Sequence, residues 1–140
     1  HEEEGARRRR CDGRVRIADG PQVEEIVRAF REYIGPIVTA VASAPPGAFF
    51  LVMTHNHELD YRLVRAILGR DDSAYCGLIG SKTKRARFER RLRDEAVAHA
   101  RLDRLICPIG AGGPSSKAPE TIAVATAAEI LRVAEAGHGR

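Results

Sequence analysis

The stretch "AFFLVMTHNHELD", residues Ala48 to Asp60, joins an apolar segment directly to a polar one. Its first residues are apolar without interruption, as is typical of a strand buried on both faces in a parallel sheet. Residues 54–58 are polar, and apolar side chains then recur at helical spacing until Gly69. The stretch therefore predicts a strand, a polar loop and a helix, which together form the basic unit of an α/β protein.

Similar units follow along the chain. "AYCGLIG" (Ala74 to Gly80) has the pattern of a second buried strand, and a very basic helix comes after it. "RLICPIG" (Arg104 to Gly110) predicts a last strand that leads into a glycine-rich loop. Pro119 then begins a helix that extends to about Val133. This helix is apolar nearly all round, so we expect it to be buried.

The first third of the chain has weaker patterns. Arg14 to Ala18 is a short strand-like run, and a helix beginning at Pro21 is expected to end at Gly35 and Pro36. Ile37 to Ser43 is β-branched, which favours a strand, although alanine is frequent there. Strands alternate with helices throughout. We therefore expect residues 1–140 to form one domain, a doubly wound parallel sheet in a three-layer α/β/α arrangement.

Composition narrows the class of protein. The 140 residues are 44% hydrophobic and carry a net charge of +4, with no apolar run near the roughly 20 residues of a membrane helix and no signal-peptide pattern. Cys11, Cys76 and Cys107 form no CxxC pair. They indicate free thiols and a cytoplasmic location.

Ligands of open parallel sheets bind at the carboxyl ends of the strands. After the first strand, Thr54, His55, Asn56 and His57 offer hydroxyl, imidazole and amide groups. In the alternative interpretation, Thr54 or Asn56 only caps the helix and a histidine bonds to a backbone carbonyl. The two histidines can bind a metal only if a further ligand comes from elsewhere in the chain.

After the second strand, "GSKTKR" combines a glycine, a serine suited to cap a helix, and cations. Gly80, Ser81, Lys82 and Arg85 are the residue types with which a helix start holds a phosphate or carboxylate. The alternative is that Ser81 only caps a solvated basic helix. The spacing is not that of a P-loop.

After the third strand, Gly110 opens a glycine-rich loop and Lys117 adds a charge near its end. Cys107 is a potential ligand or nucleophile, although a lone cysteine is more often a small buried apolar residue. The chain contains no GxGxxG motif, which counts against a complete dinucleotide site.

Three segments, in this order and spacing, resemble the C-terminal domain of the XdhC/CoxI family, the xanthine dehydrogenase accessory factors. They are "FLVMTHNHELD", "YCGLIGSKTKRARFERRL" and "CPIG" followed by "KAPETIAVATAAEIL", and the resemblance is strongest over residues 46–133. It implies a Rossmann-like domain that binds molybdenum cofactor (molybdopterin) and protects it. It also implies that the cofactor is passed in sulfurated form to a molybdenum hydroxylase such as xanthine dehydrogenase, with a cysteine desulfurase as a second partner.

Carried over residue by residue, the resemblance covers His55, His57 and Asp60, the "GSK" run with Arg85, and the "PIG" run from Pro108 to Gly110. It implies that Gly80, Ser81 and Lys82 hold the phosphate of a pterin or nucleotide, and that His55 and Asn56 contact the ring system or the molybdenum oxo groups. The predicted cofactor-binding residues are Thr54, His55, Asn56, His57, Gly80, Ser81, Lys82, Arg85, Gly110 and Lys117.

The chain departs from the family pattern at its start. Residues 1–140 show no recognisable match to the glycine-rich strand–turn–helix that normally opens the domain, or to the separate N-terminal XdhC domain. A sheet without its first strands would expose an edge. We therefore expect a homodimer, or a partner chain that supplies those strands.

Three functions remain in competition. The first is a cofactor-binding maturation factor, or chaperone, which is not itself a catalyst, because no nucleophile with a base at hand is evident. The second is an NAD(P)-binding oxidoreductase domain. The third is a nucleic-acid binder that uses Arg7 to Arg10 and Lys82 to Arg93, but no aromatic residues interleave with those cations. We expect no specific nucleic-acid binding.

Overall fold

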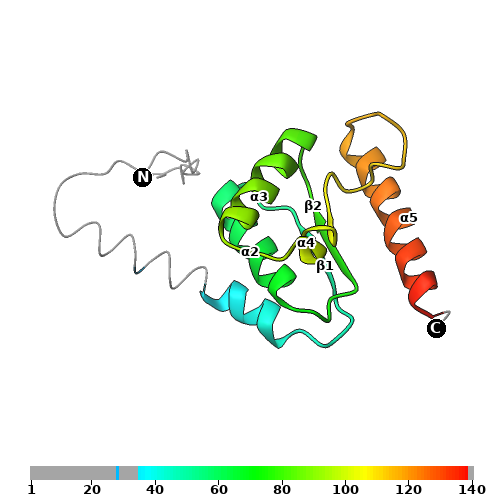
Figure 1. The fold of residues 1–140 in the computed structure, drawn as a ribbon. Coiled ribbons are helices and arrows are strands. Elements are labelled where there is room, and N and C mark those ends of the chain that lie inside the picture. Colours follow the sequence, from blue (N-terminus) through cyan, green and yellow to red (C-terminus); the bar gives the residue numbers. More distant parts are fainter. Residues whose placement is uncertain (1–27, 29–34, 139–140) are drawn as a thin grey trace, which may run out of the picture.

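The computed structural model describes residue 28 and residues 35–138 (Figure 1). The predictions for Arg7 to Arg10, for Cys11, for the strand at residues 14–18 and for most of the helix from Pro21 lie outside the described residues. A helix that includes residues 35–43 comes first. The elements after it are β1 (Phe49–Val52), α2 (His57–Gly69), β2 (Tyr75–Leu78), α3 (Lys82–Asp94), α4 (His99–Leu102), β3 (Leu105–Ile106) and α5 (Pro119–His138).

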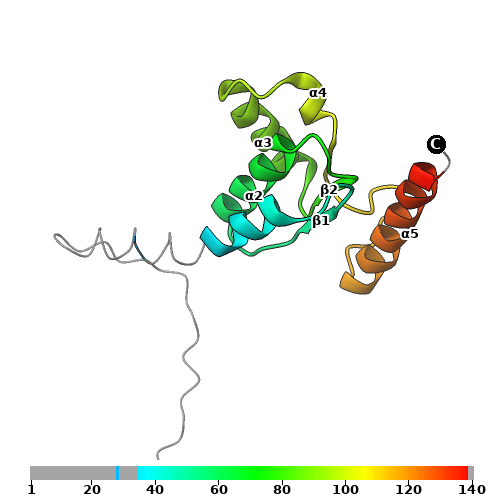
Figure 2. The same ribbon diagram turned by 90° about the horizontal axis from the view of Figure 1, so that it is seen from below.

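The strands form a parallel sheet in the order β1-β2-β3. Phe49 is paired with Tyr75, and Cys76 with Leu105. Helices α2 and α3 lie on one side of the strands and α5 on the other (Figure 2). The fold is therefore α/β and Rossmann-like, with the predicted alternation of strands and helices, although each strand is shorter than its apolar run in the sequence.

The main core lies between the sheet and the helix pair α2 and α3. Val52 and Leu78 contribute from the strands, and Val64 and Ile67 from α2; all four are at most 3% exposed. Helix α3 contributes Leu92, which is fully buried. The apolar spacing read in the sequence thus identifies the inner faces of both helices.

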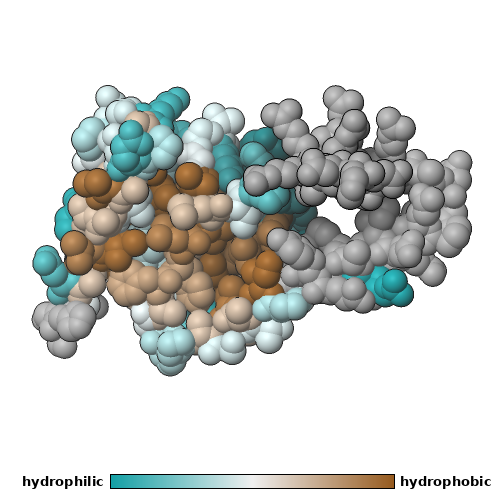
Figure 3. Space-filling model, turned by 180° about the vertical axis from the view of Figure 1, so that it is seen from behind, coloured by the Kyte–Doolittle hydropathy of each residue, from teal (hydrophilic) through white to brown (hydrophobic). Residues whose placement is uncertain are grey.

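The opposite face of the sheet is only partly covered by the described residues. Phe49, Leu51 and Met53 are 40%, 41% and 57% exposed, and Figure 3 shows apolar residues gathered on this side of the molecule. The expectation that this strand is buried on both faces is wrong for the described part of the chain. Alternate residues of β1 face the core and the open side, as the pleat of a strand requires.

Helix α5 is also less buried than expected. Val124 is 72% exposed and Leu131 is 62% exposed, whereas Ala125 and Thr126 are buried. The helix contacts the rest of the domain along one side only, which explains why the predicted burial is wrong. It also extends to His138, beyond the predicted end at about Val133.

Glu129 anchors that inner side of α5. The Tyr75 hydroxyl donates a hydrogen bond to Glu129 Oε1 at 2.6 Å, and the Gly110 N–H reaches the same atom at 3.4 Å. A Cβ on Gly113 would come within 2.5 Å of the Cβ of Ala125. Small residues in the glycine-rich loop therefore let α5 approach the sheet.

The prediction of a strand at Ile37 to Ser43 is wrong. Residues 35–43 are helical, and this helical stretch includes Gly35 and Pro36. Val41 is buried, and Ile37 packs against the core one helical turn earlier. The guanidinium of Arg70 donates to the carbonyl oxygen of Val41 and, at 2.6 Å, to that of Ala44. A cation that binds the last carbonyls favours a helix end, and this distant contact is not readable from the local pattern.

The bond between Tyr75 and Glu129, which anchors α5, makes the stability of the protein depend on pH in the alkaline range. Burial, followed by the hydrogen bond to Glu129, raises the pKa of Tyr75 above its ordinary value of 10.0. The folded state therefore holds this proton more tightly, so its contribution to stability is complete below pH 10 and is lost as the pH rises further. We expect urea unfolding to show a smaller loss of stability above pH 10 for Tyr75→Phe than for the unmodified chain. Equal losses would contradict this assignment.

Candidate functional site

The carboxyl ends of the described strands meet at one edge of the sheet. The N–H of Ile79 donates to the Val52 carbonyl at 3.0 Å, and that of Ile109 donates to the Leu78 carbonyl at 3.2 Å. These bonds continue the parallel pairing beyond the strands themselves. The loops after β1, β2 and β3 are therefore neighbours, as the sequence predicts for a ligand crevice.

A buried ion pair ties the first two loops together. Lys84 Nζ on α3 lies 2.6 Å from Asp60 Oδ2 on α2, and these side chains are 11% and 0% exposed. The same ammonium donates to the Ile79 carbonyl at 2.9 Å. On the other side, Asp60 Oδ1 accepts from the Thr54 hydroxyl at 2.6 Å and from the Thr54 N–H at 3.0 Å. One carboxylate thus fixes the ends of two strands.

The polar residues after β1 differ in whether local hydrogen bonds occupy their side chains. Asn56 is the N-cap of α2, and its Oδ1 accepts from the N–H groups of Glu58 and Leu59 at 2.9 and 3.0 Å. Thr54 is engaged by Asp60, and its Oγ1 also accepts from the Asn56 N–H at 3.2 Å. His55 and His57 are exposed. The histidines are therefore the side chains of this loop that remain open to a ligand.

The loop after β2 presents the start of α3. Ser81 is the N-cap, and its hydroxyl oxygen accepts from the Lys84 N–H at 3.1 Å. The first bond to a helix carbonyl runs from Arg85 N to Ser81 O, so the N–H groups of Lys82 and Thr83 have no acceptor within the helix. Lys82 is exposed. Free N–H groups beside an exposed ammonium are suited to bind an anion.

Gly80 has a packing role that the sequence does not reveal. A Cβ at this position would lie 2.4 Å from Lys84 Cδ. The lysine side chain passes directly over the glycine on its way to Asp60. Gly80 is therefore needed to let the ion pair form, whether or not a ligand also approaches it.

The third loop joins the site through Arg85 and Cys107. Arg85 Nη1 donates to the Cys107 carbonyl at 3.2 Å, while its Nε bonds to Glu89 at 2.8 Å. Burial raises the pKa of the Cys107 thiol, against the opposing effect of Lys84 and Arg85. A buried thiol with a raised pKa is a poor nucleophile.

Gly110 and Lys117 are set apart from the other predicted residues. Gly110 has φ +68° and packs against α5, where its Cβ would lie 3.0 Å from that of Ala125. Lys117 is exposed in the loop before α5, and none of the described contacts joins it to the residues of the first two loops.

Cations gather between α2 and α3 next to the first loop. A small cavity of about 140 Å³ lies there, lined by His57, Lys84 and Arg87 among others. Within residue 28 and residues 35–138, no three His, Cys, Asp or Glu side chains are grouped so that they could hold a metal ion. His55 and His57 thus have no third ligand among the described residues.

The prediction of individual site residues missed the two that join the first two loops, Asp60 and Lys84. The family resemblance covers Asp60 without giving it a binding role, and the sequence pattern presents Lys84 as one of the cations after Ser81 that suit an anion. A signal does exist in the sequence. Asp60 lies at helical spacing with Leu63, Val64 and Ile67, so it falls on the apolar face of α2. A carboxylate on such a face requires a buried partner.

Comparison with known proteins agrees with this architecture. The XdhC Rossmann domain family matches residues 4–130. "Uncharacterized protein YqeB" of Escherichia coli (strain K12) is 33% identical over 105 residues, which are 73% of this chain and 18% of that protein. The chain thus spans less than a fifth of that relative's length. Among the described residues, no helix is both long enough and apolar enough to span a membrane. The Rossmann-like sheet and the family match lead to one conclusion: the chain belongs to the XdhC Rossmann domain family.

Proposed function

We propose that this chain binds molybdenum cofactor in the crevice between the loops after β1 and β2. It serves as an accessory factor that protects the cofactor and delivers it to a molybdenum hydroxylase of the xanthine dehydrogenase type. A cysteine desulfurase that sulfurates the cofactor is the second partner. The role is binding and transfer in the cytoplasm, without catalysis by the chain itself.

One observation supports this proposal: the Asp60–Lys84 ion pair joins the loops after β1 and β2, and α3, with free N–H groups at its start, follows directly after the second loop. Buried ion pairs are costly unless they are well bonded, and this one is bonded on both sides. It fixes the relative position of two loops, and such a fixed position is useful to a ligand that contacts both of them.

The donor chemistry fits a pterin with a phosphate. The N–H groups of Lys82 and Thr83, with the Lys82 ammonium, would hold the phosphate. The exposed His55 and His57 would face the pterin and the groups around molybdenum. When bound, the cofactor supplies the molybdenum centre and its sulfur ligand, which the receiving hydroxylase needs. Thr54, Asn56 and Ser81 would keep these donors in place, since their own hydrogen bonds are made within the loops.

The exposed face of the sheet supports a partner for the chain. Phe49, Leu51 and Met53 present apolar side chains beside β1, which lies at an edge of the described sheet. Exposed apolar patches and open strand edges favour association. We therefore retain a homodimer, or a partner chain that pairs with this edge, as part of the proposal.

Equilibrium binding tests the proposal directly. We expect molybdopterin to bind the chain, and Lys82→Ala to weaken that binding by at least about tenfold, since a charge-assisted phosphate contact is worth about 1.5 to 3 kcal/mol. Ser81→Ala should weaken it less. Arg90→Ala is the matched control, because Arg90 is an exposed cation of the same helix, two turns from its start, and should leave affinity unchanged.

NAD and GTP serve as competitors in the same experiment. The Rossmann-like sheet alone leaves an NAD(P) site as the alternative, although fold does not determine function. Binding of NAD in preference to molybdopterin would overturn the proposal in favour of that alternative. An equal loss of affinity in Lys82→Ala and Arg90→Ala would show nonspecific attraction to a basic helix instead of a site.

A further inference from the structure

The small cavity between α2 and α3 adjoins the crevice. Its volume is about 140 Å³, and its lining includes His57, Lys84 and Arg87. His57 follows the loop after β1, and Lys84 bonds to the loop after β2, so the cavity and the crevice share these two side chains. Pockets that enclose a whole small molecule have about 300 Å³ or more. The small cavity therefore has room for one group of a ligand whose main part lies in the crevice.

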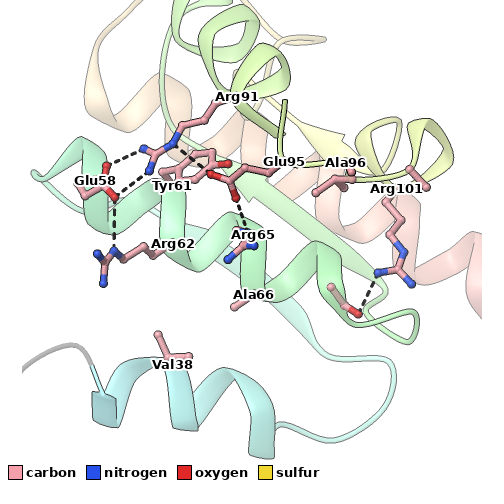
Figure 4. Close-up of a pocket in the computed structure, with 13 residues that line it drawn as sticks. Val38, Glu58, Tyr61, Arg62, Arg65, Ala66, Arg91, Glu95, Ala96 and Arg101 are labelled. Carbon is pink, nitrogen blue, oxygen red and sulfur yellow. Dashed lines mark hydrogen bonds and ion pairs between the residues drawn. The ribbon is translucent and has the colours of Figure 1, made fainter. Parts of the chain in front are cut away.

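The arginine, lysine and glutamate side chains that line the small cavity are paired within the described part of the chain, with one exception. Arg91 binds Glu58 through two bonds of 2.7 and 3.1 Å (Figure 4). Asp60 binds Lys84 at 2.6 Å. Arg87 is exposed and has neither an ion pair nor a hydrogen bond among the described residues. Its charge is uncompensated, so the electrostatic potential in the cavity favours an anion.

Lys84 provides a second donor in the same place. Its ammonium has three N–H groups, of which one bonds to Asp60 Oδ2 at 2.6 Å and one to the Ile79 carbonyl at 2.9 Å. The third has no oxygen acceptor among the described residues, although the side chain is only 11% exposed. Lys84 and Arg87 are three residues apart on α3, so they are neighbours on the helix surface. An oxyanion in the cavity can accept from both.

The small cavity also lies close to the proposed phosphate position at the start of α3. That position is formed by the N–H groups of Lys82 and Thr83, and Lys84 follows them directly. From Lys82 to Arg87 the helix rises by only about 7.5 Å. The side chains of lysine and arginine are long enough to span this rise. Two phosphates that share an oxygen can therefore contact both positions at once.

We infer that the form of cofactor favoured by this site carries a second phosphate, as in a molybdopterin that is joined to a nucleotide through a diphosphate. The first phosphate lies at the start of α3, and the second lies in the small cavity, where it accepts from Arg87 and Lys84. The inference rests on the proposed function, because it names the form of the ligand that the same crevice binds. Arg87 is the residue that distinguishes this form from molybdopterin itself.

Equilibrium binding of molybdopterin, of its cytosine dinucleotide and of its guanine dinucleotide tests the inference. We expect both dinucleotides to bind at least about fivefold more tightly than molybdopterin, because each adds a charge-assisted phosphate contact. Arg87→Gln should weaken both dinucleotides to about the affinity of molybdopterin. Arg90→Gln is the matched control and should preserve the preference, since Arg90 is an exposed cation of the same helix that does not line the cavity.

The outcomes separate this inference from the proposed function. If molybdopterin binds and the dinucleotides bind no more tightly, the inference fails while the proposed function keeps its support. If one dinucleotide alone is preferred and Arg87→Gln keeps that preference, the base is recognised instead of the diphosphate, and the inference fails. Binding of ADP as tight as that of the dinucleotides would also overturn it, because the pterin would then contribute nothing. If none of the pterin compounds binds, both fail.

Discussion

Asp60→Ala should lower the free energy of unfolding by about 3 to 5 kcal/mol, the largest effect that we expect from a single substitution. The change leaves the Lys84 ammonium, which is only 11% exposed, without its counter-charge. It also removes the acceptor of the Thr54 hydroxyl and N–H. The unfolding transition in urea, followed by circular dichroism, measures the loss.

Two comparisons make this result specific. Asp103→Ala removes a carboxylate from an exposed pair with His99, whose side chains are 71% and 75% exposed, and should change stability by less than about 0.5 kcal/mol. The double variant Asp60→Asn, Lys84→Met removes both charges together and should recover much of the loss. Because Asn can still accept from Thr54, a double variant as unstable as Asp60→Ala would show that the unpaired charge does not dominate the effect.

Leu92→Ala should cost about 2 to 5 kcal/mol, because it removes a fully buried side chain from the only apolar stripe of α3. Phe88 and Leu92 are the buried residues of that helix. Apart from the buried Lys84–Asp60 pair, the ion pairs of this helix involve partly or largely exposed side chains and contribute little. The loss is measured by urea unfolding in the same way as for Asp60→Ala.

Leu131→Ala is the matched control, since it makes the same chemical change on α5 at a position that is 62% exposed. It should change stability by less than about 0.5 kcal/mol. A small effect of Leu92→Ala would mean that ion pairs, and not the apolar stripe, hold α3 in place. The start of the proposed phosphate site would then depend on salt concentration.

Local patterns in the sequence were sufficient for the units that carry the crevice. The run from Ala48 to Asp60 and the apolar spacing after it correctly predict β1 and α2, because strand and helix periods are local properties. The same holds for β2 and α3. Asn56 and Ser81 cap α2 and α3, as the alternative interpretations of these residues predict. Their contact with the cofactor stays a prediction.

Contacts between distant residues account for the misses. Residues 35–43 are helical because Val41 packs on the core and Arg70 binds the last carbonyls of the helix. No pattern within residues 35–43 indicates that Arg70, far along the chain, binds the end of this helix. The exposure of α5 has a similar origin, since its contacts with Tyr75 and the glycine loop leave Val124 and Leu131 facing outward.

The sequence does not indicate which cation pairs with Asp60. The position of Asp60 on an apolar face calls for a cation, but several cations of α3 could meet it until the packing of α2 on α3 selects Lys84. The role of Gly80 follows from that choice, because the lysine side chain occupies the space of a Cβ.

The attachment of α5 also determines how the domain opens in its native state. This helix is joined to the sheet by the hydrogen bond between Tyr75 and Glu129 and by packing of Ala125 on the glycine loop, whereas β2 has a neighbour on each side and is fully buried. We therefore expect the amide protons of α5 to exchange with deuterium through local detachment of the helix. The amide protons of β2 should exchange only through global unfolding, and hence more slowly. Two classes of amide exchange should result, a faster one in α5 and a slower one in β2.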